Sequence, residues 1–147
     1  YRPFFFGARE WVVKSVVDNF KAKYPDLVVA GYRNGYYPKE EEVNIAEMIR
    51  ESRADMLFVG FSSPMKEIFL NKWMPVMGVP FCMGVGGSFD IVAGKTKRAP
   101  DWMQKTGLEW LYRVIQEPRR MWKRYAKTNP AFVWVVFREY MKKIKQI

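Results

Sequence analysis

Residues 54–67 read ADMLFVGFSSPMKE, and this stretch joins an apolar run to the start of a helix. The run over 54–61 predicts a buried strand, because it is nearly continuous in apolar residues. Ser63 is suited to cap a following helix, and Pro64 is suited to its first position. The stretch therefore predicts a strand and then a helix over 62–74.

The same alternation continues on both sides of this stretch. Further strands are predicted over 1–8, 27–32 and 79–86, and further helices over 9–25 and 39–52. Strands that alternate with helices indicate an α/β fold, a Rossmann-like parallel sheet flanked by helices. Ligands of such sheets bind beyond the carboxyl ends of the strands, which here are the loops after Gly31, Phe61 and Val85.

The character of the chain changes after Gly94. Residues 101–147 carry 11 Lys and Arg against four acidic residues, so they hold +7 of the net charge of +10. We predict two domains, an α/β domain over 1–97 and a basic helical appendage over 98–147. Within the appendage Pro118 is expected to begin a helix, and Asn129-Pro130 is expected to break it.

Composition excludes several kinds of chemistry. The chain of 147 residues has one cysteine and no histidine, which removes internal disulfides, Ser-His and Cys-His catalysis and histidine-ligated metals. There is no Asp-x-Asp motif and no Walker loop, so neither a metal nor a cofactor is expected. The apolar run over 131–137 is far shorter than the roughly 20 residues that span a bilayer.

The turn GVGGSFD at 84–90 is one candidate site. Gly84 and Gly86 match the first two glycines of the dinucleotide fingerprint, but Phe89 stands at the third. Glycines let a backbone approach a phosphate, and Asp90 can accept hydrogen bonds from a ribose or a base. A tight turn without a ligand explains the same glycines.

Two further loops carry candidate binding residues. Ser63 and Lys66 stand at a predicted helix start, where an anion can bind. Taken alone, these residues favour plain capping by Ser63 and a solvated Lys66. Tyr36 follows the second strand, where it can stack on a base or fold back on the core.

The appendage offers Arg113, Arg120 and Lys123, which recur at intervals of seven and three. These intervals share a face across an unbroken helix, although Pro118 can bend it. Arginine forks suit phosphates. The alternative is a solvated or membrane-facing basic surface, and the tryptophans among these cations fit a membrane interface, nucleic-acid stacking or core packing.

These motifs together resemble one family. ADMLFVGFSSPMKE, the GYY at 35–37 and the long segment 84–125 are similar to the WecG/TagA/CpsF family of bacterial glycosyltransferases. The resemblance covers essentially the whole chain, and it implies that the family's first strands and helices lie upstream of residue 1.

The resemblance implies an inverting, metal-independent transfer of an N-acetylmannosamine-like sugar. The donor is a UDP-sugar, and the acceptor is an undecaprenyl-diphosphate-linked sugar of cell-surface polysaccharide or teichoic acid synthesis. It further implies a peripheral location on the cytoplasmic face of the bacterial membrane, with an anionic membrane surface as a partner. On this basis residues 1–97 would bind the nucleotide sugar, and residues 98–147 would close the active site and contact the membrane.

The resemblance also assigns roles to matching residues. Tyr36 and Asp90 would contact the uridine, and Ser63, Lys66, Gly84 and Gly86 would complete the donor site. Arg113, Arg120 and Lys123 would be the catalytic cations that neutralise diphosphate charge as the leaving group departs. Lys66 stands where the family often has glutamine and Lys123 where it often has arginine, and the family's catalytic aspartate would lie upstream.

Two other readings stay open from the residues alone. One is a non-catalytic, membrane-associated nucleotide-binding remnant. The other is a nucleic-acid-binding module, for which no recognisable motif is present, so nucleic acid is not an expected partner. The apolar, basic tail suits a neighbouring subunit as well as lipid, which leaves a homo-oligomer open.

Overall fold

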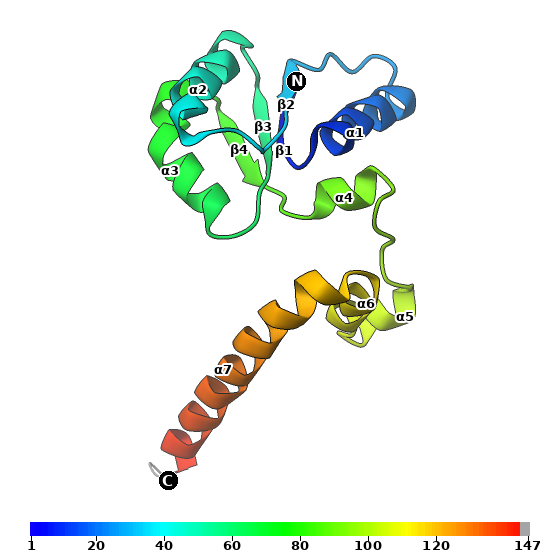
Figure 1. Ribbon diagram of the computed structural model, residues 1–147, viewed down its shortest axis with the longest axis vertical. Coiled ribbons are helices and arrows are strands. Elements are labelled where there is room, and N and C mark those ends of the chain that lie inside the picture. Colours follow the sequence, from blue (N-terminus) through cyan, green and yellow to red (C-terminus); the bar gives the residue numbers. More distant parts are fainter. Residues whose placement is uncertain (145–147) are drawn as a thin grey trace. The chain divides into compact units, whose positions relative to one another are not determined.

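A four-stranded sheet organises the first part of the chain (Figure 1). The computed structural model describes the backbone of residues 1–144, and the side chains of these residues apart from 119–125, 127–128 and 142–144. The chain divides into two compact units, Tyr1–Lys97 and Arg98–Ile147, and each is described by itself.

The sheet of the first unit is parallel throughout. Its strands are β1 (Pro3–Gly7), β2 (Gly31–Arg33), β3 (Met56–Gly60) and β4 (Phe81–Gly84), in the order β2-β1-β3-β4. The other elements of this unit are α1 (Glu10–Lys23), η1 (Lys39–Glu41), α2 (Glu42–Glu51), α3 (Met65–Met77) and α4 (Ser88–Val92). The predicted α/β fold with a parallel sheet flanked by helices is confirmed.

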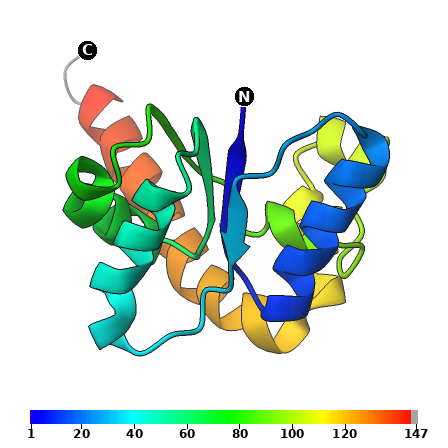
Figure 2. The same ribbon diagram turned by 90° about the horizontal axis from the view of Figure 1, so that it is seen from above.

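Helices cover both faces of the central strands, as Figure 2 shows, with α2 and α3 on one side and α1 and α4 on the other. Successive side chains of a strand point to opposite faces. Phe4 and Phe6 therefore join the core under α2 and α3, while Phe5 joins the core under α1 and α4. This is why the sequence of β1 is apolar at every position.

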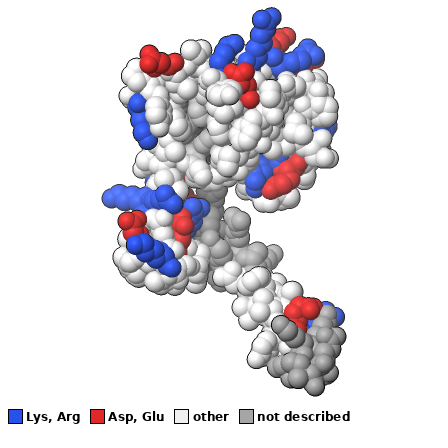
Figure 3. Space-filling view, turned by 180° about the vertical axis from the view of Figure 1, so that it is seen from behind, with Lys and Arg blue, Asp and Glu red and all other residues white. Residues whose placement is uncertain are grey.

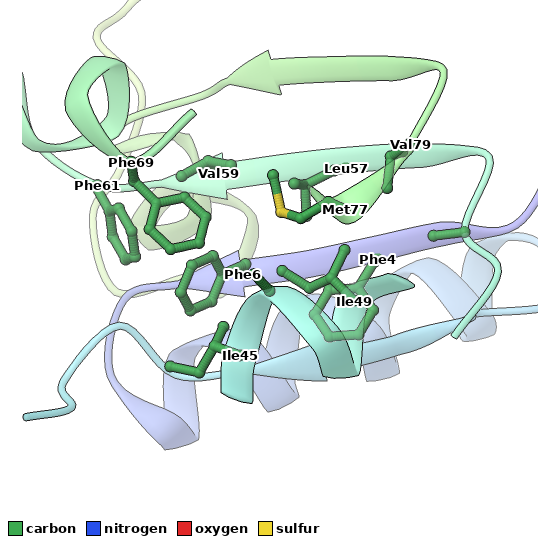
Figure 4. Close-up of a cluster of buried hydrophobic side chains, with 12 residues drawn as sticks. Phe4, Phe6, Ile45, Ile49, Leu57, Val59, Phe61, Phe69, Met77 and Val79 are labelled. Atoms are coloured by element: carbon green, nitrogen blue, oxygen red, sulfur yellow. The ribbon is translucent and has the colours of Figure 1, made fainter. Parts of the chain in front are cut away.

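The larger core lies under α2 and α3 (Figure 4). Ile45 and Ile49 of α2 meet Phe4 and Phe6 of β1, and all four side chains are buried. Toward the carboxyl end of β1 the Phe6 ring contacts Phe61 and Phe69, with ring centroids 4.7 and 5.0 Å apart. An aromatic cluster thus fixes the end of the sheet from which the binding loops emerge.

The second strand differs from its prediction. The run over 27–32 was expected to form a buried strand, but only Gly31–Arg33 pairs with β1, and Val28 is exposed. Among the described strands β2 is at an edge of the sheet, with a neighbour on one side only. An edge strand needs less apolar cover than a central one, so the apolar run did not fix its length.

The start of α3 also differs from its prediction. Ser63 was expected to cap this helix and Pro64 to be its first residue, but the cap position is Pro64 and no side chain caps it. The Ser63–Pro64 peptide is cis, and the Ser63 hydroxyl donates to the Glu67 carboxylate at 3.2 Å. The capping role assigned to Ser63 is therefore wrong.

The second unit is helical, with α5 (Asp101–Lys105), α6 (Glu109–Gln116) and α7 (Pro118–Ile144). Pro118 begins α7 as expected, but Asn129-Pro130 does not break it, because α7 continues through Pro130. The prediction failed because proline removes one backbone hydrogen bond of a long helix and need not end it. In the part of the chain that the structure describes, no helix is long and apolar enough to cross a membrane.

Candidate functional site

The binding loops leave the carboxyl edge of the sheet where the direction of strand connection reverses. β1 is followed by α1 on one face, and β3 is followed by α3 on the other. In open parallel sheets this change of side creates the crevice in which ligands bind. The loops after β1, β2, β3 and β4 therefore define the candidate site.

Part of this crevice is filled by the protein itself. Gly7 and Gly60 are partners at the ends of β1 and β3, and a Cβ on Gly7 would lie 2.8 Å from the Gly60 backbone. A Cβ on Gly35 would lie 2.5 Å from the Phe61 ring and 3.0 Å from the Gly7 Cα atom. These contacts close the space between the ends of β1 and β3, so room for a ligand lies farther toward β4.

The loop after β2 bends over the end of β1. Gly35 donates its backbone N–H to the Ala8 carbonyl at 2.8 Å, and Asn34 donates to the Glu10 carboxylate at 2.7 Å. Tyr37 folds back against Phe6, and burial raises the pKa of its hydroxyl to about 12. Tyr36 is 71% exposed, which leaves its ring at the surface of the loop, as stacking on a base requires.

Lys66 links the start of α3 to the end of β4. A Cβ on Gly84 would lie 2.6 Å from Cδ of Lys66, so the lysine stem rests directly on that glycine. The Lys66 ammonium pairs with the Glu67 carboxylate at 2.7 Å, and its hydrogen bond holds the pKa of Glu67 below the ordinary value. Glu67 also accepts the Ser63 hydroxyl. Ser63, Lys66 and Gly84 thus form one connected group at this edge.

The turn after β4 leaves backbone open beside that group. Gly86 has a φ of +53°, and a Cβ there would meet only the Phe61 carbonyl oxygen, at 3.8 Å. Because glycine has no Cβ atom, an anion can come close to the backbone N–H groups at such a turn. Gly84 and Gly86 therefore lie together with Ser63 and Lys66, which the sequence had placed in separate motifs.

Asp90 lies on α4, a few residues after the glycine turn. Its carboxylate pairs with the Lys95 ammonium at 2.9 Å, and its backbone carbonyl accepts the N–H of Thr96. Sequence reasoning did not single out Lys95. The basic segment GKTK at 94–97 was a signal that could have done so, because a cation five residues after a helical carboxylate can fold back onto it.

The appendage residues are described within their own unit. Arg113 of α6 pairs with Glu109 one helical turn earlier, at 3.2 Å. Arg120 and Lys123 lie in α7, so the three cations do not belong to one unbroken helix, because α6 ends at Gln116 and Pro118 begins α7. The side chains of Arg120 and Lys123 fall outside the described residues. The catalytic roles of all three remain predictions.

Charge is dispersed on the one face of residues 1–97 that the space-filling view presents (Figure 3). Figure 3 shows Lys and Arg at several separate places on the face of residues 1–97 that it presents, some beside Asp or Glu. Among the described residues no group of three or more histidine, cysteine, aspartate or glutamate side chains could hold a metal ion. At this edge the structure places the Lys66 ammonium, the Ser63 hydroxyl and the open backbone at Gly86, a combination suited to a phosphorylated ligand.

Comparison with known proteins gives this arrangement a context. Residues 1–146 match the family described as the glycosyl transferase WecG/TagA/CpsF family. The chain is 37% identical, over 138 residues, to an N-acetylglucosaminyldiphosphoundecaprenol N-acetyl-beta-D-mannosaminyltransferase of Bacillus subtilis (strain 168). It is 36% identical, over 137 residues, to the protein of the same name from Bacillus spizizenii.

The two matches cover a larger share of this chain than of the relatives. They cover 94% and 93% of this chain but 52% of each relative, so the chain spans about half the length of these curated relatives. The family match, by contrast, runs through both units of the chain. The chain belongs to the WecG/TagA/CpsF family of glycosyl transferases.

Proposed function

We propose that this chain forms the nucleotide-sugar-binding part and the appendage of a glycosyltransferase. The enzyme would transfer an N-acetylmannosamine-like sugar from a UDP donor to an undecaprenyl-diphosphate-linked sugar. One observation carries the proposal: the family match extends over residues 1–146, and both relatives compared above are named as N-acetyl-beta-D-mannosaminyltransferases that act on N-acetylglucosaminyldiphosphoundecaprenol.

The carboxyl edge of the sheet supports a diphosphate donor. Lys66 brings a positive charge to the end of β4, and the open backbone at Gly86 supplies N–H groups beside it. When a diphosphate arrives, the ammonium can exchange the exposed Glu67 carboxylate for a phosphate oxygen. Tyr36 would stack on the uracil from the loop after β2, and Asp90 would accept hydrogen bonds from the uridine.

The chemical step calls for charge compensation as UDP leaves. We assign this role to Arg113, Arg120 and Lys123 of the appendage, because cations stabilise the negative charge that develops on a departing diphosphate. With cations in this role the transfer needs no metal, and direct displacement by the acceptor hydroxyl inverts the sugar. We place the general base in the part of the family's chain that this chain does not span.

The appendage also supports a peripheral membrane location. The α7 residues 131–137 are exposed all around the helix, with Phe132, Trp134 and Phe137 each more than half exposed. Basic residues precede and follow this apolar stretch. Apolar side chains that enter the headgroup region, flanked by cations, favour an anionic membrane surface. We propose the cytoplasmic face, where the lipid-linked acceptor is met.

A calorimetric titration of UDP into the 147-residue chain tests the donor site. We expect UDP to bind and GMP not to bind, and Asp90→Ala to abolish the UDP signal. The substitution removes one partly exposed ion pair, so it should change the free energy of unfolding by less than about 1 kcal/mol. UDP binding that Asp90→Ala leaves intact would contradict the assignment of Asp90.

Sedimentation with anionic vesicles tests the membrane role. We expect Phe137→Glu to weaken binding markedly, because it places a carboxylate in the apolar stretch of α7. Ile68→Glu is the matched control, since Ile68 is a similarly exposed apolar side chain on α3. Equal losses for the two variants would mean that α7 has no special part in membrane contact.

A further inference from the structure

The face of the sheet that carries α1 and α4 is only partly covered. Met56 and Phe58 of β3 lie on this face, and their strand partners on β4 are Phe81 and Met83. Phe81 and Met83 are each 48% exposed. The strands of parallel sheets are normally buried on both faces. On the opposite face α2 and α3 cover the sheet. Within the described residues, β4 has no such cover on the face of α1 and α4.

A hollow of about 290 Å³ extends this uncovered region between α1 and α4. Phe20 and Tyr24 form its wall on the α1 side, Met56 and Phe58 form its floor, and Val85 and Val92 lie toward α4. The atoms that line it are apolar. Small-molecule sites combine apolar walls with a few directed polar groups, so this hollow is better suited to apolar protein side chains.

One further element could cover both the hollow and the exposed side chains of β4. The relatives contain additional polypeptide that could provide this element. The chain spans 52% of the relatives' length, so these proteins contain nearly as many residues again. We propose that a helix from that remaining part packs its apolar face over Phe58, Phe81 and Met83 and into the hollow.

The topology of the sheet indicates where such a helix belongs when the remaining part precedes β1, as the resemblance to the family implies. In the described sheet β4 pairs with β3 alone, and its other edge is open to a further strand. A strand added there and connected to β1 crosses the sheet in the same direction as the β1–α1–β2 connection. Because parallel connections are right-handed, the connecting helix falls on the face of α1 and passes over β4 and β3.

This placement brings the added helix to the candidate site. In a right-handed connection the helix runs antiparallel to the strands and therefore begins at their carboxyl edge. Val85 and Ser88, which line the hollow, flank the open turn at Gly86. The first residues of the added helix would complete the site from that side. The inference rests on the fold and on the length of the relatives, and it does not depend on the proposed transfer reaction.

Thiol labelling tests the proposal. In a Cys82→Ser background, Met83→Cys and Ile68→Cys each place one thiol at an exposed position, on the uncovered face and on α3 respectively. Both should react readily with a charged thiol reagent in the 147-residue chain. The measurement is repeated after the chain is joined to the part of the Bacillus subtilis relative that lies outside the match, in the order in which that relative carries the two parts.

In the joined protein we expect the Met83→Cys reaction to slow about tenfold or more, and the Ile68→Cys reaction to keep its rate. The same labelling of the 147-residue chain mixed with that part as a separate polypeptide provides a second measurement if the joined protein does not fold. Unchanged labelling of Met83→Cys in both formats overturns the proposal. Equal protection of both thiols overturns it as well, because it would report general burial.

Discussion

Alanine at Gly7 and alanine at Gly84 should have very different effects on stability, although each glycine ends a strand at the same edge of the sheet. A Cβ at Gly7 would lie 2.8 Å from backbone atoms of Gly60, and Gly7 has a φ of +125°. A Cβ at Gly84 would come even closer to its neighbour, 2.6 Å from Cδ of Lys66. The difference is that Gly60 presents backbone inside a sheet, whereas Lys66 presents a flexible stem near the surface.

The expected magnitudes follow from these neighbours. Gly7→Ala adds backbone strain of about 1–3 kcal/mol and overpacking of about 1–3 kcal/mol, so the free energy of unfolding should fall by about 2–6 kcal/mol. For Gly84→Ala the lysine stem can rotate away, and alanine in a strand gains about 0.5–1 kcal/mol over glycine. We therefore expect a net change within about 1 kcal/mol at Gly84.

Urea unfolding followed by circular dichroism measures both changes, provided that the slope of free energy against urea stays constant across the variants. Titration of UDP into Gly84→Ala adds a functional readout, because displacement of the Lys66 stem should weaken binding while the fold persists. A loss of stability at Gly84 equal to or above that at Gly7 would refute the reasoning. It would mean that the closest distance, and not the rigidity of the neighbour, decides the cost.

Three further outcomes follow from single residues. The hydrogen bond from Lys72 lowers the pKa of Glu42 below its ordinary value near 4.5. Glu42→Gln should therefore lower the free energy of unfolding by about 1 kcal/mol near pH 7. In urea unfolding experiments this difference should vanish as the pH falls from about 4.5 through the lowered pKa of Glu42. Burial raises the pKa of the Cys82 thiol, so alkylation at pH 8 should be several-fold slower in the native chain than in urea, and equal rates would contradict this. Pro130→Ala should increase the helical circular dichroism signal and the thermal stability of α7, because proline is about 3 kcal/mol less favourable than alanine inside a helix. An unchanged circular dichroism signal would count against a continuous α7.

Most of the α/β architecture could be predicted because its signal is local. The strand that becomes β1 is apolar at each position, since Phe5 faces one core while Phe4 and Phe6 face the other. The length of β2 could not be predicted in this way. Val28 belongs to the same apolar run, yet it lies outside the strand and is exposed, because the pairing of an edge strand depends on the register with β1.

The candidate site could be predicted as a set of motifs but not as an arrangement. The sequence separates Lys66 from Gly84 by a helix and a strand, and only the packing of the lysine stem on the glycine joins them. For the pairing of Asp90 with Lys95 the sequence offers the basic segment 94–97 as a signal, but no periodic pattern that fixes the fold of these residues after α4. Ser63 had a standard capping context, but the hydroxyl donates to Glu67 instead.

The position of open space at the sheet edge connects the two proposals. The ends of β1 and β3 are closed by Gly7, Gly35 and Phe61, whereas the turn at Gly86 is open. That turn is also where the apolar hollow reaches the carboxyl edge, through Val85 and Ser88. A ligand at Gly86 and a helix in the hollow would therefore share a boundary. Because packing of that helix would fix one wall of the site, affinity for UDP should rise when the remaining part of the family's chain is present, even if that part contributes no direct contact to the nucleotide.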